Sequence, residues 1–224
     1  MHDAWIPLLL SLKVAGWATA LDLLLGVAAG YALARWRSGA RDLVDSLLTL
    51  PLVLPPTVLG YYLLVLLGPR GVIGGWLDRL GIQLVFTWQG AVIASMIVAF
   101  PLVLKSARAA FESIDPQLER AARTLGLGEA AVFFRVSLPL ATRGILAGAL
   151  LAFARALGEF GATLMIAGNL PGRTQTLSVA VYAAVQAGDD ETATLLVLIT
   201  SAVCVLILVA AGRLVPQRAH GRAR

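Results

Sequence analysis

Long uninterrupted runs of apolar residues dominate the pattern along this chain. Crossing a bilayer as a helix takes roughly 20 apolar residues. Runs of that kind fall at 8–34, 47–67, 88–104, 144–167 and 193–211. The pattern predicts an all-α, polytopic membrane bundle of about five transmembrane helices. We expect residues 1–224 to form a single transmembrane domain.

Composition strengthens the membrane prediction and narrows the chemistry. Hydrophobic residues make up 58% of the chain and charged residues 14%, with a mean hydropathy of +0.82, whereas soluble domains are roughly 25% charged. Cys204 is the single cysteine, and His2 and His220 lie at the two ends. No apolar run therefore offers histidine ligands for haem or a catalytic metal. We expect no catalytic residue, metal site or cofactor.

Basic residues fall mainly in alternate connections between the apolar runs. Because Lys and Arg near span ends favour the cytoplasm, this bias predicts a periplasmic N-terminus and a cytoplasmic C-terminus in an inner membrane. It also explains the net charge of +5 without a nucleic-acid surface. Only Arg70, Arg79 and Arg173 fall in the opposite loops; the residues on the cytoplasmic side are Arg35, Arg37, Arg41, Lys105, Arg108, Arg120, Arg123, Arg135, Arg143, Arg213, Arg218, Arg222 and Arg224.

Prolines interrupt the second apolar run at Pro51, Pro55 and Pro56. Each proline removes a backbone donor and clashes with the preceding turn. Irregular backbone at membrane depth persists only where it is buried in protein or lines a water-filled cavity. Two interpretations stay open, a bend that lines a pathway and an ordinary packing kink.

Ionisable side chains inside apolar runs are few. Arg155 and Glu159 lie one helical turn apart and can pair. Such groups usually face the bundle interior or a polar pathway. The pair is either structural or part of a translocation gate, where Gly161 gives flexibility and the arginine supplies positive potential. Asp22, with Lys13 nine residues before it, is interpreted as a packing or subunit contact.

The connection at 105–143 is too patterned for a tether. Asp115 suits an N-cap, Pro116 the first helical position and Glu119 the first turn, while Gly126 is placed to end the helix. A second short helix is expected at 129–136, stopping before Pro139. One face of the first helix should be apolar, carrying Leu118, Ala121, Ala122 and Leu125. Such a hairpin can lie on lipid headgroups or insert into a groove on a partner.

The same connection resembles the EAA loop of binding-protein-dependent ABC importers. That pattern is Glu-Ala-Ala, three residues, Gly, nine residues, then Ile-x-Leu-Pro, and here it reads Arg120-Ala121-Ala122, Gly126 and Val136-Ser137-Leu138-Pro139. Arg120 stands in place of the signature glutamate, with Glu119 beside it, and Val136 replaces isoleucine. The resemblance implies a type I ABC importer permease fold and a loop that docks into an ATPase. The implied coupling residues are Asp115, Glu119, Arg120, Ala121, Ala122, Arg123, Gly126, Leu138 and Pro139.

Two further segments are similar to molybdate, tungstate and sulfate permeases, and most of all to the molybdate type. They are Leu50-Pro51-Leu52-Val53-Leu54-Pro55-Pro56-Thr57-Val58-Leu59-Gly60 and the stretch 155–176. The residues assigned to the translocation pathway or gate are Pro55, Pro56, Arg155, Glu159 and Gly161. Sulfate and tungstate remain alternative cargoes.

No Gly-x-x-x-x-Gly-Lys-Ser/Thr sequence occurs, so ATP hydrolysis must come from a separate partner. The resemblance implies two copies of this chain in the membrane lipid, two ABC ATPase subunits and a periplasmic oxyanion-binding protein. The polar stretch 169–191, with a short helix near 177–186, should help to receive that protein. A secondary transporter of anions is the main rival. It would need inverted repeats or many intramembrane ion-coupling residues, and neither is seen.

Overall fold

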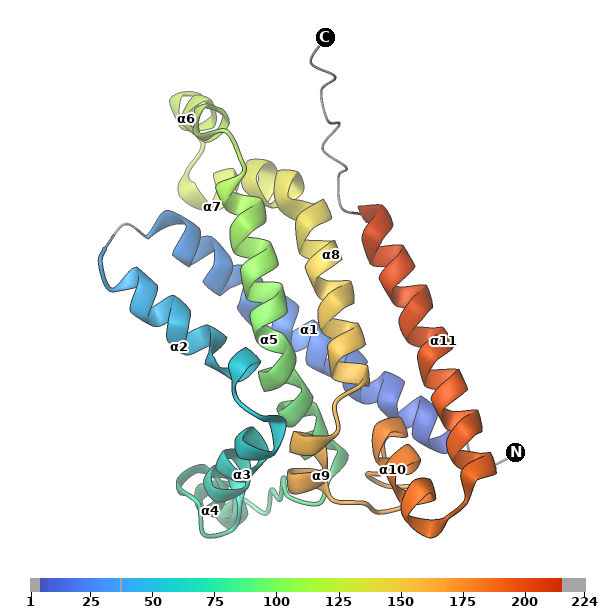
Figure 1. The fold of residues 1–224 in the computed structure, drawn as a ribbon. Coiled ribbons are helices and arrows are strands. Elements are labelled where there is room, and N and C mark those ends of the chain that lie inside the picture. The colour runs from blue at the N-terminus through green and yellow to red at the C-terminus, as the bar shows by residue number, and fades with distance from the viewer. Residues whose placement is uncertain (1–4, 37, 215–224) are drawn as a thin grey trace.

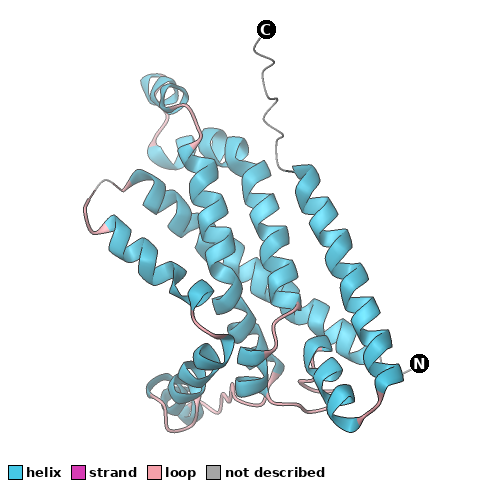
Figure 2. Ribbon diagram, in the orientation of Figure 1, coloured by secondary structure: helices cyan, strands magenta, loops and turns pink. Residues whose placement is uncertain are grey.

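The computed structural model describes residues 5–36 and 38–214, and all regular structure within them is helical (Figures 1 and 2). Arg37 and the basic tail residues Arg218, Arg222 and Arg224 lie outside the described residues. The elements are α1 (Trp5–Arg35), α2 (Arg41–Val53), α3 (Pro56–Leu67), α4 (Val72–Arg79), α5 (Trp88–Glu112), α6 (Pro116–Thr124), α7 (Glu129–Val132), the π-helical turn η1 (Phe133–Ser137), α8 (Leu138–Leu157), α9 (Gly161–Ala167), α10 (Leu177–Ala187) and α11 (Asp190–Leu214).

Helices α1, α5 and α8 form the centre of the bundle (Figure 1). Small residues allow α1 and α5 to approach closely, as expected between membrane helices. A methyl group added at Gly30 would lie 2.9 Å from the backbone nitrogen of Arg108, and one added at Gly26 would lie 3.0 Å from a methyl of Val103. The buried core around these contacts is aliphatic, with alanines at closest approach.

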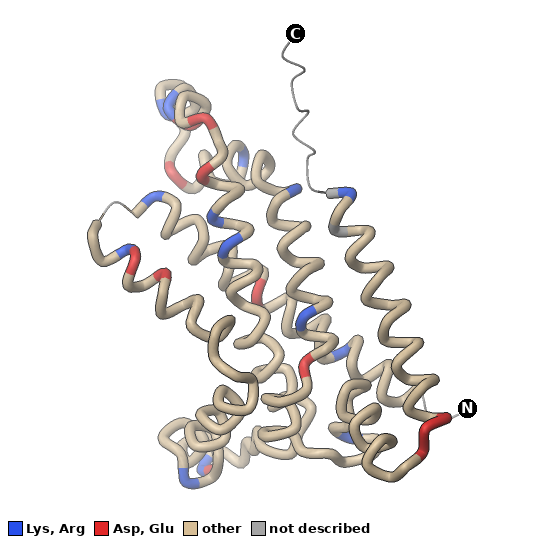
Figure 3. Tube along the Cα trace, viewed as in Figure 1, with Lys and Arg blue, Asp and Glu red and all other residues tan. Residues whose placement is uncertain are grey.

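Four helices, or helix runs, are long and apolar enough to span a membrane: Trp5–Arg35, Trp88–Glu112, Glu129–Leu157 and Asp190–Ala210. A fifth span arises if the bent pair α2 and α3 counts as one. The prediction of an all-helical membrane bundle with about five spans is therefore confirmed. Charged residues gather toward the α6 end and leave the middle of the bundle largely neutral (Figure 3).

The second apolar run is broken more sharply than a kink. The axes of α2 and α3 differ by 108°, with the break at Leu54 and Pro55. Pro55 takes φ −55° and ψ 134°, and Pro56 follows as the first residue of α3. Because a residue before proline is pushed out of the helical region, consecutive prolines end α2 and restart the chain in a new direction. Pro51 is tolerated inside α2.

The expectation of one continuous helix at 144–167 is wrong. Helix α8 ends at Leu157, and the short α9 begins only at Gly161. Hydropathy could not separate the two, because the intervening residues Gly158, Glu159 and Phe160 are too few to interrupt an apolar run. Helix α9 packs instead against α3, which fixes its separate direction.

The expected stop before Pro139 is also wrong, since the helix runs on from Glu129 to Leu157. The turn η1 widens to π geometry there, and the amide of Leu138 donates to the carbonyl of Phe133. Pro139 cannot donate to the carbonyl of Arg135 and would clash with it in a regular α-helix. The wider turn accommodates the proline without ending the helix.

Candidate functional site

Helix α6 stands at one end of the bundle and forms as its capping residues predict (Figure 1). The Asp115 carboxylate accepts a hydrogen bond from the amide of Gln117 at 2.9 Å, and Pro116 occupies the first turn. Gly126 has φ +85°, a conformation that glycine adopts readily and that ends the helix. The carboxylate of Glu129 binds Arg123 through two nitrogens, at 2.6 and 3.0 Å, and so joins α7 to α6.

The two sides of α6 differ in burial. Glu119 and Ala122 face the bundle and are buried. Leu118 and Leu125 are 49% and 83% exposed, and Ala121 is exposed as well. The predicted apolar face is therefore divided: Ala122 packs on the bundle, while the other three residues are left uncovered by this chain. An exposed apolar helix face of this kind suits docking into a groove.

Glu119 holds α6 against the bundle. Its carboxylate pairs with Arg35 at the end of α1 and accepts a hydrogen bond from the Ser137 hydroxyl at 2.7 Å. Arg120, which stands where the signature glutamate was expected, is exposed. The carboxylate that matters structurally is thus one position earlier in the chain. Leu138 and Pro139 continue from Ser137 into α8.

A second region lies where the two broken runs meet. Pro51–Pro56, Val98 of α5 and Arg155 of α8 line a hollow of about 280 Å³. Four of the five predicted pathway residues, all except Gly161, lie in or directly behind its wall. Gly161 packs against α3, where an added methyl would lie 3.1 Å from Pro56. The predicted residues are therefore brought together.

The predicted pair between Arg155 and Glu159 forms, with Nη1 to Oε2 at 2.7 Å. The Glu159 side chain is 1% exposed, and its other oxygen accepts the amide of Ala162 at 2.9 Å. The Arg155 side chain is 32% exposed and lines the hollow. Both glutamate oxygens are engaged within the chain, so the hollow is lined by the cation and not by the anion.

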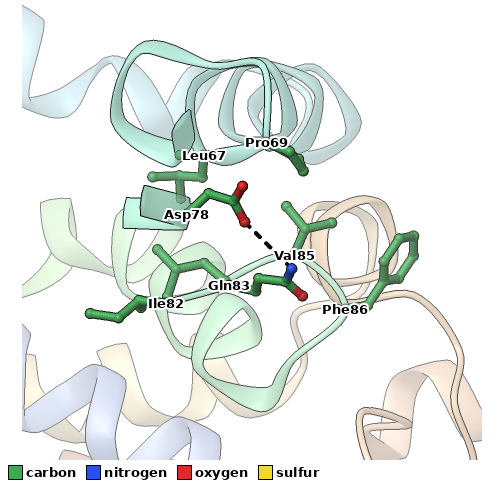
Figure 4. A pocket seen from close by; sticks show the side chains of 9 residues that line it. Leu67, Pro69, Asp78, Ile82, Gln83, Val85 and Phe86 are labelled. Atoms are coloured by element: carbon green, nitrogen blue, oxygen red, sulfur yellow. Dashed lines mark hydrogen bonds between the residues drawn. The ribbon is translucent and has the colours of Figure 1, made fainter. Parts of the chain in front are cut away.

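Other candidate sites differ from these two. A hollow of about 130 Å³ lies between α4 and the loop before α5, where Gln83 donates to Asp78 at 3.4 Å (Figure 4). None of the residues predicted for function line it. Asp22 is fully buried within this chain, so its side chain is not exposed for direct contact with another subunit. The Lys13 ammonium lies 3.6 Å from the centroid of the Trp88 ring.

Comparison with known proteins places the chain in context. Residues 23–220 match the family described as binding-protein-dependent transport system inner membrane components. The chain belongs to this family. The molybdenum transport system permease protein ModB of Escherichia coli strain K12 is 46% identical over 206 residues, covering 91% of this chain and 90% of that protein. ModB of Haemophilus influenzae is 45% identical over 189 residues, covering 83% and 82%.

Solved bacterial ABC transporters share the fold. A bacterial ABC transporter involved in the import of alginate aligns with a TM-score of 0.75 at 16% identity, covering 95% of this chain and 79% of that one. The inward-facing MetNI methionine transporter aligns with a TM-score of 0.70 at 16% identity, covering 95% and 92%. These matches confirm the importer permease fold.

Sequence reasoning missed the contacts that Arg35, at the end of α1, and Ser137, inside the family loop, make with Glu119. In the sequence Arg35 is only a topology signal, and Ser137 is only the variable position of the motif. Their shared partner, Glu119, lies 84 and 18 residues away along the chain. No local pattern signals such pairs. The one hint was that an acidic residue stands next to Arg120.

Proposed function

We propose that this chain is the membrane-spanning permease subunit of an ATP-driven importer that moves molybdate across the inner membrane. The observation that carries the importer proposal is α6, anchored to the bundle on one side and apolar and exposed on the other. The names of the ModB relatives support molybdate as the cargo. The subunit carries out no reaction of its own, and a separate ABC ATPase hydrolyses ATP.

The proposed assembly contains two copies of this chain, two ATPase subunits and a periplasmic oxyanion-binding protein. The α6 end faces the cytoplasm, because Arg35 ends α1, Lys105 and Arg108 lie in the last part of α5, and Arg143 lies near the start of α8. The N-terminus is then periplasmic and the C-terminus cytoplasmic. Closure of the ATPase pair pushes on the loop 105–143, with Leu118 and Leu125 inserted into the ATPase.

The proposed route for the anion passes the hollow at Pro55 and Arg155. The guanidinium group supplies several N–H donors and a fixed positive charge, which suit an oxyanion. A carboxylate on the same wall would repel the cargo, and Glu159 is turned into the protein instead. The break at Pro55 and the packing of Gly161 on α3 let the backbone line a polar route at membrane depth.

Co-purification tests the importer proposal. The chain is expressed together with the ABC ATPase of its own organism, and the bound ATPase is measured for L118D, L125D and the parent chain. Both variants should lose most of the ATPase, because each buries a charge in the docking groove. The matched control is L80D, which changes a leucine that is 58% exposed and directly follows α4, a helix at the end of the bundle opposite α6 (Figure 1). Equal retention by all four chains contradicts the proposal.

Uptake tests the cargo. Cellular molybdenum is measured in a strain lacking this chain and in the same strain carrying it, with sulfate or tungstate in competition. Restored molybdenum uptake that excess sulfate leaves unchanged supports molybdate. Unchanged molybdenum in the deletion strain refutes it, and competition by sulfate makes that alternative the cargo. An uptake that persists without any ATPase favours the secondary transporter.

A further inference from the structure

The Glu119 carboxylate of α6 contacts side chains from three different parts of the chain. The residue is 5% exposed although its helix stands at the edge of the bundle. Its carboxylate pairs with Arg35 and accepts the Ser137 hydroxyl at 2.7 Å, and Arg123 lies 3.8 Å away. A buried carboxylate remains charged only where such partners compensate the lost water.

Two of these partners, Arg35 and Ser137, belong to the two longest helical runs of the bundle, Trp5–Arg35 and Glu129–Leu157. Arg35 is the last residue of α1, and Ser137 is the last residue of η1, directly before α8. Ser137 is fully buried, so water does not compete for its hydroxyl. One side chain of α6 is therefore bonded to two helices that cross the membrane.

Aromatic packing makes the base of this cluster rigid. Tyr31 packs edge to face against Phe111 at 5.1 Å and against Phe133 at 4.7 Å, joining α1, α5 and η1. The Arg35 guanidinium lies 5.0 Å from the Tyr31 ring. The arginine that holds Glu119 is thus itself held between a ring and a carboxylate, in a geometry suited to guanidinium.

Little else fixes α6 to the bundle on this side. Of its nine residues only Glu119 and Ala122 are buried. A polar hollow of about 500 Å³ lies between α6 and the ends of α1 and α5, with Arg35, Glu119, Arg120 and Arg123 in its wall. A displacement of α6 can reach the bundle through Glu119, through the packing of Ala122, through the pair between Arg123 and Glu129 of α7, or through the short connections at its ends.

We propose that Arg35 and Ser137 are positioning residues: they hold Glu119 and so deliver the displacement of α6 to α1 and α8 together. This inference rests on the proposed importer function. Helix α8 runs from Leu138 to Leu157 without a break and carries Arg155 to the hollow. A rigid helix of this kind transmits a push at Ser137 along its length of about 30 Å.

The test compares S137A, R35Q and R35K with the parent, each in the full transporter reconstituted in proteoliposomes. The readout is molybdate transported per ATP hydrolysed, with bound ATPase and thermal melting measured on the same samples. S137A and R35Q should transport about three- to tenfold less per ATP while keeping the ATPase bound. R35K should retain more coupling than R35Q, because the positive charge remains near Glu119.

The matched control is S113A. Ser113 also carries a hydroxyl close to α6 in the chain, but it is exposed, and its hydroxyl donates to the carbonyl of Ala110 at 2.7 Å. It should transport as the parent does. If S137A and R35Q match S113A, the positioning role is refuted, and it is refuted equally if they lose the ATPase. A parent chain that binds no ATPase overturns the importer proposal itself, which is a separate result.

Discussion

Close packing of α1 on α5 can be tested at Gly30. A methyl group there would lie 2.9 Å from the Arg108 nitrogen, 2.9 Å from the Ala107 methyl and 3.1 Å from the Leu104 carbonyl oxygen. Two of these three atoms belong to the backbone, so they cannot move aside without displacing the helix. G30A should therefore force α1 and α5 apart.

The expected magnitude comes from two opposing effects. Replacing glycine with alanine inside a helix favours folding by about 1 kcal/mol, whereas overpacking a tight contact costs about 1–3 kcal/mol. Gly16 lies on the same helix, is exposed and has no atom within 4 Å of an added methyl. G16A should show only the favourable effect. The difference between G16A and G30A then isolates the packing cost, about 1–3 kcal/mol.

Thermal melting of the helical circular dichroism signal in detergent measures this difference. About 2 kcal/mol corresponds to a shift of about 4–8 °C for a chain of this size. G26A should fall between the two variants, because its close neighbour is largely the Val103 side chain, which can rotate. Identical melting of G30A and G16A would show that α1 and α5 do not approach as described.

Three further variants test other parts of the structure. E159A should lower the free energy of unfolding by about 3 kcal/mol, because it leaves Arg155 without its buried partner. E159Q should lose less stability in the same melting assay, since its side-chain amide oxygen can still accept the hydrogen bond from the Ala162 amide. D22N should melt at or above the parent temperature and still transport, because neither carboxylate oxygen of Asp22 has a hydrogen-bond partner among the described residues; a clear loss of stability would contradict this. P139A should slow hydrogen exchange of the amides at 133–142, since without proline the wide turn can tighten to an α-helix; unchanged exchange would argue against proline as its cause.

Hydropathy and charge were sufficient to predict the membrane bundle, because burial in lipid requires long apolar helices whatever their tertiary contacts. Helix capping is likewise determined by local sequence. As predicted, α6 begins after Asp115 with Pro116 in its first turn, and it ends just before Gly126. Helix α10 also forms close to its predicted range, at Leu177–Ala187. These successes share one property: the physical cause lies within a few residues of the effect.

The errors arose where tertiary packing decides. The local sequence gives no signal that separates α8 from α9. The direction of α9 is fixed by tertiary packing, since Gly60 of α3 closely approaches Ala162 and Met165. Pro139 was expected to stop a helix, but one wider turn accommodated it. The pairing of Glu119 with Arg35 depends on a contact between residues far apart in sequence. Propensity gives no information about such contacts.

The breaks between α2 and α3 and between α8 and α9 explain how Glu159 can lie beside the proposed anion route. Each break leaves backbone groups that a membrane cannot hydrate. At the second break, the first amides of α9 lack helical partners, and Glu159 satisfies the amide of Ala162 at 2.9 Å. The same carboxylate holds Arg155 at 2.7 Å, which keeps the guanidinium beside the prolines of the first break. Because Glu159 performs both tasks inside the protein, its charge is compensated there, and the wall of the hollow presents a positive group to the proposed route.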